Sequence, residues 1–323
     1  MKPDRHPPAR RRLRTVVRAV AAAAVVLALA GLAYQQLAER RDAQRFPPPG
    51  RLVDIGGHRL HLLCAGTGTP TVLLEAGLGN DVNHWSGLFE ALAGEGRVCA
   101  YDRAGLGWSE AGPMPRTPAR LADETARLLA ASGEAAPFVL VGHSNGGAHV
   151  RLLAQARPGE IAGMVLVDPN APHPDGCPPM PFATRAGFGT LAALAGFGLP
   201  RLLLPTLFPL ERSALPAQAR TTHGALRART AALRAVWSEA RAGCDLVAAA
   251  EAVPWPAGVP VEVLSAGRRP PQLAWVPQAH RAMAQAAGGR WTEVAGAGHW
   301  IQLEQPEAVL AAIRRVRSAP AGN

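Results

Sequence analysis

The chain has 323 residues, of which 48% are hydrophobic and 18% charged, so it can bury one large core and is not a disordered protein. Its formal net charge of +10 arises mainly in the first 45 residues, which hold ten basic and three acidic side chains. The rest of the sequence has no basic run interleaved with aromatic residues, which argues against a nucleic-acid-binding groove.

Residues 19–38 form a charge-free, mostly apolar stretch behind an arginine-rich cluster. Twenty such residues suffice for one membrane-spanning helix, so we expect an uncleaved anchor within residues 1–45. The arginines before the stretch favour a cytoplasmic N-terminus, with the body of the chain outside the cytoplasm and held at the cell membrane. A cleaved signal peptide, giving a secreted protein, is the alternative, because residues 31–33 resemble a small-x-small cleavage site.

Beyond a proline-rich linker, short apolar runs alternate with helix-like segments such as residues 118–132 and 147–156. This order predicts an α/β fold with a mainly parallel sheet and helices on both faces. The strand signals are a hairpin within residues 50–66 and single runs at 71–77, 97–105, 138–144, 163–169, 260–267 and 290–298.

No strand signal occurs between residues 169 and 259, where the sequence has proline-rich joints and helical stretches such as 217–242. So long an insertion predicts a helical cap, residues 173–253, over the carboxyl edge of the sheet. The cap divides the core into residues 46–172 and 254–318, with a tail at 319–323. Within the cap, residues 188–210 are unusually apolar, and three interpretations stay open. The segment packs on the core, lines a pocket for a lipophilic substrate, or forms a membrane-facing lid.

The segment VLVGHSNGG, residues 139–147, places Ser144 between Gly142 and Gly146 in the spacing G-x-S-x-G. This spacing lets a chain leave a strand, turn sharply with the serine at the apex and enter a helix. We therefore expect Ser144 to be a nucleophile presented at a helix N-terminus, where the helix dipole favours developing negative charge. A purely structural serine turn is the alternative.

A serine hydroxyl needs a base near neutral pH, and His299 is the candidate. It lies in a glycine-rich loop directly after the last predicted strand, from which its imidazole can reach across the sheet edge. The backbone N–H groups of Leu78, in the loop after the third strand, and of Asn145 are the expected oxyanion donors. We expect no metal ion, because the other histidines lack ligand spacing.

Several motifs together resemble the α/β-hydrolase fold superfamily, namely AGLG, YDRAGLGWSE, LVGHSNGG, LVDP and GAGHWIQLEQPEAV. The similarity covers about residues 51–313 and points to capped bacterial members with an N-terminal membrane anchor. It implies a mostly parallel eight-stranded sheet with a helical cap after strand 6, and a Ser-acid-His triad without a cofactor. Asp102 and Arg103 match a turn that is mainly structural in that family, and Asn145 departs from the usual apolar or aromatic residue.

The triad acid is where the sequence departs from the commonest pattern of that family. The usual carboxylate follows the seventh strand, but Arg268 and Arg269 stand there, and arginine cannot accept the imidazole N–H. Asp168 closes the sixth strand beside the nucleophile strand, a position at which some branches of the superfamily carry their acid. We therefore expect Asp168 to orient His299, with Asp175 or a purely structural Asp168 as the alternatives.

In the strand order of that family the second and fourth strands are neighbours, and these carry Cys64 and Cys99. Cys177 and Cys244 both fall in or beside the cap. For a domain outside the cytoplasm, this even count predicts the disulfides Cys64–Cys99 and Cys177–Cys244, with four buried free thiols as the alternative.

Together these features predict a membrane-tethered serine hydrolase that cleaves small or lipophilic carboxylic esters through an acyl-enzyme. Its expected partners are a small-molecule ester and the membrane, with no nucleic acid and no obligate protein partner. Acyltransferases, amidases and aminopeptidases use the same triad and stay as alternatives. A non-catalytic binding protein is disfavoured, because such proteins usually lose a triad member and both Ser144 and His299 are present.

Overall fold

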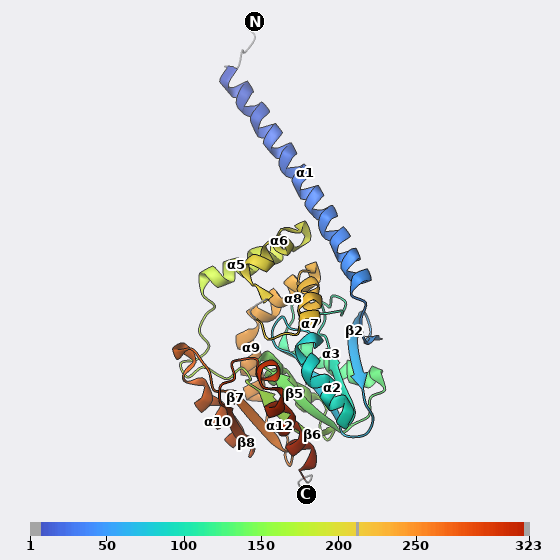
Figure 1. Ribbon diagram of the computed structural model, residues 1–323. Coiled ribbons are helices and arrows are strands. Elements are labelled where there is room, and N and C mark those ends of the chain that lie inside the picture. The colour runs from blue at the N-terminus through green and yellow to red at the C-terminus, as the bar shows by residue number, and fades with distance from the viewer. Residues whose placement is uncertain (1–7, 211–212, 320–323) are drawn as a thin grey trace.

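The computed structural model describes residues 8–210 and 213–319, and an eight-stranded sheet forms its centre (Figure 1). The strand order is β1-β2-β4-β3-β5-β6-β7-β8; β2 is antiparallel to β1 and β4, and all other pairs are parallel. The predicted α/β fold class is thus confirmed. The strands span Arg51–Asp54 (β1), Arg59–Ala65 (β2), Thr71–Glu75 (β3), Val98–Tyr101 (β4), Phe138–His143 (β5), Ile161–Val167 (β6), Val261–Ala266 (β7) and Arg290–Val294 (β8).

Helices cover both faces of the sheet (Figure 1). Val72 belongs to the apolar cluster on one face and its neighbour Leu73 to the cluster on the other, and both are fully buried. Because successive strand residues point to opposite faces, a sheet covered on both sides needs this continuous apolar sequence. One face packs against α2 (Ser86–Glu95) and α12 (Pro306–Ser318), the other against α3 (Pro118–Ser132), α4 (Asn145–Ala156) and α10 (Val276–Ala286).

A helical cap is inserted between β6 and β7, as the fold class predicts. The predicted helical stretch 217–242 is divided into two helices, and Glu39 of the N-terminal helix accepts hydrogen bonds from the Thr230 backbone N–H (2.7 Å) and hydroxyl (2.8 Å) at the start of the second. The cap comprises α5 (Phe182–Ala193), η2 (Ala195–Phe197), α6 (Leu199–Leu207), α7 (Ala217–Leu226), α8 (Thr230–Arg241) and α9 (Gly243–Ala252).

The N-terminal helix α1 (Pro8–Arg45) projects away from the body of the molecule (Figure 1). Within the described residues it is the one helix long and apolar enough to cross a membrane, a property that signal sequences share. Its last turns contact the cap, where Gln35 Nε2 donates to the Ala228 carbonyl at 2.9 Å and Arg201 pairs with Asp42. Residues 1–7 of the predicted N-terminal segment and 320–323 of the predicted tail lie outside the described residues.

Both predicted disulfides are confirmed. Cys64 and Cys99 are register partners on the antiparallel pair β2–β4, with Cα atoms 4.1 Å apart. Cys177 and Cys244 join the segment before α5 to the first turn of α9, with Cα atoms 5.8 Å apart. The second bridge therefore ties the two ends of the cap together.

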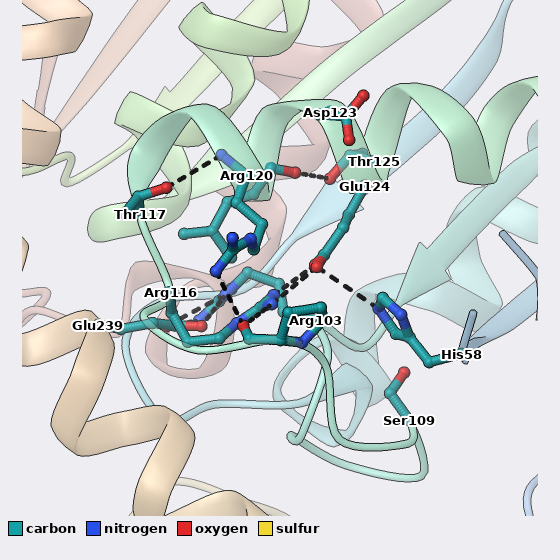
Figure 2. A network of polar contacts seen from close by, with 12 residues as sticks. His58, Arg103, Ser109, Arg116, Thr117, Arg120, Asp123, Glu124, Thr125 and Glu239 are labelled. Carbon is teal, nitrogen blue, oxygen red and sulfur yellow. Dashed lines mark hydrogen bonds and ion pairs between the residues drawn. The ribbon is translucent and has the colours of Figure 1, made fainter. Parts of the chain in front are cut away.

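A buried polar network in the core, shown in Figure 2, reaches the cap through a hydrogen bond. Arg116, whose side chain is fully buried, pairs with Glu124 of α3, and Glu124 also lies 3.5 Å from His58 Nε2. The backbone N–H of Arg116 donates to Ser238 of α8 at 2.8 Å. The position of α8 over the sheet edge is therefore fixed by polar contacts as well as by packing.

Candidate active site

Ser144 stands at a sharp turn between β5 and α4, with φ 54° and ψ −121°. Few residues other than glycine adopt such a backbone, and this strain is typical of nucleophile elbows. The flanking glycines allow the turn, because a Cβ on Gly142 would lie 2.3 Å from the Gly146 carbonyl oxygen and one on Gly146 would lie 2.3 Å from the Glu75 carbonyl oxygen. The serine hydroxyl is thus presented at the carboxyl edge of the sheet.

Asp168 and His299 meet at the same edge. Asp168 Oδ2 accepts a hydrogen bond from His299 Nδ1 at 2.7 Å, and because a carboxylate only accepts, the imidazole proton lies on Nδ1. Asp168 Oδ1 accepts from the Ala266 backbone N–H at 2.9 Å and from Arg269. Burial opposes ionisation of Asp168, but its bonds with His299 and Ala266 and the charge of Arg269 lower its pKa, so it remains a carboxylate.

The Ser144 hydroxyl has a neighbour that the sequence analysis missed. Within the part of the chain that the structure describes, its hydrogen bond goes to Asn170 Oδ1 at 3.3 Å rather than to His299. Asn170 Nδ2 in turn donates to Asn145 Oδ1, and the Asn170 backbone N–H donates to the Ser144 carbonyl at 3.1 Å. The signal that could have identified Asn170 is its place two residues after Asp168, in the same strand-end loop.

Two buried histidines flank the Asp168–His299 pair, and neither competes for the proton that these two residues share. Burial, together with the neighbouring His299, lowers the pKa of His143 to about 3, and burial lowers the pKa of His280 to about 4. His143 Nε2 donates to the His299 carbonyl at 2.9 Å, and His280 Nε2 donates to the Pro169 carbonyl at 2.7 Å. Both rings are therefore neutral near neutral pH and hold the two catalytic loops in place.

The loop expected to carry one oxyanion donor lies directly against the nucleophile. A Cβ on Gly77 would lie 3.1 Å from Ser144 Cβ, which places Leu78, the next residue, beside the serine. Asn145, the other predicted donor, is the first residue of α4, where backbone N–H groups are free of helix partners.

Arg103, drawn with Glu239 in Figure 2, bonds to the backbone of this loop. Its guanidinium donates to the Ala76 carbonyl at 2.6 Å and the Gly77 carbonyl at 2.8 Å, and pairs with Glu75 and with Glu239 of α8. Burial would lower the pKa of Arg103, but the two carboxylates outweigh it and raise that pKa, so the side chain stays charged. One cation therefore connects the oxyanion loop to the cap.

A cavity of about 910 Å³ lies between this edge and the cap. Asp168, Asn170 and His299 line it from the core side, and Met180, Arg185 and Val247 are among the residues that line it from the cap. This volume lies within the usual range for sites that bind small molecules.

The sequence pattern of the alpha/beta hydrolase family matches residues 62–312, well over half of the chain. The chain belongs to this family. The match includes Leu78, Ser144, Asn145, Asp168 and His299, the residues that the sequence analysis singled out.

Relatives of this hydrolase have varied activities. It is 25% identical to the enol-lactonase of Burkholderia xenovorans LB400, with a TM-score of 0.63, covering 83% of this chain and 100% of that one. It is also 25% identical to a thermophilic esterase of Thermogutta terrifontis, with a TM-score of 0.57, covering 80% and 92%. The putative carbamate hydrolase RutD of Azorhizobium caulinodans is 38% identical over 103 residues, 32% of this chain and 38% of that protein. The chain spans half or less of the length of the first curated relatives it matches.

A further polar group of this hydrolase joins the loop after β3 to the cap. Asp81 Oδ2 accepts a hydrogen bond from His223 Nδ1 of α7 at 2.8 Å, and His84 Nδ1 lies 3.6 Å from Asp81 Oδ1. The three side chains are buried and close enough together to offer ligands to a metal ion. This group could not be predicted from local sequence, because His223 is 142 residues from Asp81.

Proposed function

We propose that this hydrolase cleaves carboxylic esters, small or lipophilic, through an acyl-enzyme formed on Ser144. The observation that carries the proposal is the hydrogen-bonded Asp168–His299 pair at the sheet edge on which the elbow presents Ser144. The esterase and enol-lactonase among the similar structures support acyl transfer from an ester as the reaction class.

Each residue has a role that its position allows. Asp168 accepts the Nδ1 proton of His299, so the lone pair on Nε2 is free to take the proton of Ser144 as its oxygen attacks the ester carbonyl. The backbone N–H groups of Leu78 and Asn145 stabilise the resulting oxyanion. His299 then protonates the departing alcohol, and a water molecule, deprotonated by the same imidazole, releases the acid and restores Ser144. This scheme needs no cofactor or metal ion.

We also propose that α1 stays attached as a single-pass anchor and that the catalytic domain lies outside the cytoplasm. The length and composition of α1 support the anchor, and the ion pair of Asp42 with Arg201 gives the end of this helix a partner in the cap. The two disulfides support the location, because such bonds persist in oxidising compartments.

Labelling with a fluorophosphonate and assay with a p-nitrophenyl ester test this function. The wild-type chain should be labelled at Ser144 and hydrolyse the ester, and Ser144→Ala should lose both labelling and at least a thousandfold of kcat while its melting temperature stays within a few degrees. Added alcohol or amine acceptors distinguish hydrolysis from transfer by the partition of the acyl group. A well-folded Ser144→Ala variant that still turns over the ester would overturn the proposal.

A further inference from the structure

The cap carries an exposed apolar surface around α6. We call it the cap apolar face, and none of its residues lines the cavity of the candidate active site. Large apolar side chains gathered on one surface mark contacts with a membrane or another protein. The cap apolar face consists of Leu199, Leu202, Leu203 and Leu207 of α6 and Phe208 at its end, of which Leu202 is 61% exposed and Leu207 55%.

Within α6 the cap apolar face carries no exposed charge, and at its end Arg227 donates to the Phe208 carbonyl at 2.8 Å. Arg201 is the one charged residue in the sequence from 199 to 210. Its side chain turns toward α1, where it pairs with Asp42 and donates to Gln35 Oε1 at 3.1 Å. The exposed side of α6 is therefore uncharged, which suits hydrocarbon better than the polar rim of a protein interface.

The cap apolar face begins where the cap touches α1. Gly31 lets the two backbones approach, because a Cβ there would lie 2.5 Å from the Phe197 carbonyl oxygen. Gly198, with φ +75°, lies against Tyr34, whose ring would be 2.5 Å from a Cβ on that glycine. These direct contacts fix the height of α6 along α1, and Figure 1 shows α5 and α6 at the end of the body from which α1 projects.

The length of the apolar stretch sets the depth of this contact in a membrane. Residues 19–38 rise about 30 Å at 1.5 Å per residue, the thickness of a hydrocarbon core, whereas residues 19–30 alone rise only about 18 Å. The apolar stretch therefore extends into the turns of α1 that touch the cap. Gly31 lies about 10 Å deeper than Ala38 on the same count, a depth to which interfacial amphipathic helices are buried.

We infer that the cap apolar face inserts into the outer layer of the same phospholipid bilayer that α1 crosses. Met180 and Arg185, which line the active-site cavity, lie at the start of the cap segment that leads through α5 into α6. The substrate class that fits is a lipophilic ester that enters the cavity from the bilayer. The inference rests on the proposed anchor and the proposed ester hydrolysis.

The test uses the full-length protein in phosphatidylcholine vesicles that contain a phosphatidylcholine with a diazirine on its acyl chain. After irradiation, mass spectrometry of tryptic peptides should find lipid adducts on residues 19–30 of α1 and on the peptide 202–212. The double variant Leu202→Gln/Leu207→Gln should lose at least fivefold of the adducts on that peptide and keep those on α1. The control Met114→Gln, which removes an exposed apolar side chain outside the cap, should keep both.

Turnover gives an independent measurement. The double variant should hydrolyse a long-chain ester dissolved in the vesicles at least fivefold more slowly, while its kcat/KM for a water-soluble short ester stays within twofold of wild type. Adducts on α1 without adducts on 202–212 would overturn the docking, whether water or a second copy of the chain covers the face. Absence of adducts on α1 would remove the anchor and the docking with it. Labelling by lipid requires no catalysis, so the labelling result tests the docking independently of the proposed hydrolase activity.

Discussion

Asp168→Asn tests the proposed triad most directly. The Ala266 N–H and Arg269 both donate to Oδ1, so the amide oxygen of the variant must stay there and the NH₂ group must face His299 Nδ1. Nδ1 then has to accept, which moves the imidazole proton to Nε2, where it blocks removal of the Ser144 proton. Such a change of tautomer lowers kcat by about 10⁴-fold, equivalent to about 5 kcal/mol in the activation barrier.

The assay compares kcat for a p-nitrophenyl ester with the free energy of unfolding in urea. Stability should fall by about 2 kcal/mol, because the bond from Arg269 changes from a carboxylate acceptor to a neutral amide. Asp175→Asn is the matched control, since the side chain of Asp175 is 92% exposed and its nearest charged partner is His173 at 4.0 Å; its kcat should stay within twofold of wild type. A folded Asp168→Asn variant within tenfold of wild-type kcat would refute the triad as proposed.

Two further changes test the supports of the site. Arg103→Met should lower the free energy of unfolding by about 3–5 kcal/mol, because it leaves the buried Glu239 unpaired. Arg127 forms an exposed ion pair, so the control Arg127→Met should be nearly neutral in the same urea titration. Equal effects of the two substitutions would contradict the role of Arg103. Burial lowers the pKa of His280 to about 4, below its ordinary value near 6.5. The folded state therefore loses stability relative to the unfolded state as the pH falls from 6.5 toward 4, by about 3 kcal/mol in all. His280→Gln should therefore flatten the pH dependence of the unfolding free energy between pH 7 and 4, and an unchanged slope would count against this assignment.

The fold was predictable because the sheet is buried on both faces. The central strands then read as continuous apolar runs, as residues 138–141 do, and the long interval without such a run marks the cap. The break between α7 and α8 was not predictable from local sequence. At this break Glu39, 191 residues away on another helix, accepts a hydrogen bond from Thr230, and no propensity of residues 217–242 encodes that contact.

The candidate site shows the same division. Ser144 and His299 are identified by glycine spacing and by their place after strands, which are local signals. The contacts of Asn170 and Arg103 are not encoded locally, because the sheet assembles their partners. Asn170 reaches Ser144 across neighbouring strand ends, and Arg103 meets Glu239 over a separation of 136 residues. Sequence therefore locates the reacting groups better than the groups that position them.

Asp168 at the end of β6 and Arg269 after β7 act together in the candidate site. Because no carboxylate follows β7 in the sequence, Asp168 was predicted to be the triad acid. The structure shows that Arg269, which follows β7 instead, pairs with Asp168. Because parallel neighbours end at one edge, Arg269, three residues after β7, reaches Asp168, directly after β6. It bonds Oδ1 while His299 bonds Oδ2, so the cation helps to keep the acid ionised and leaves the second oxygen for the imidazole. An acid at the end of β6 with a cation at the end of β7 thus presents the same acceptor to His299 as an acid at the end of β7 would.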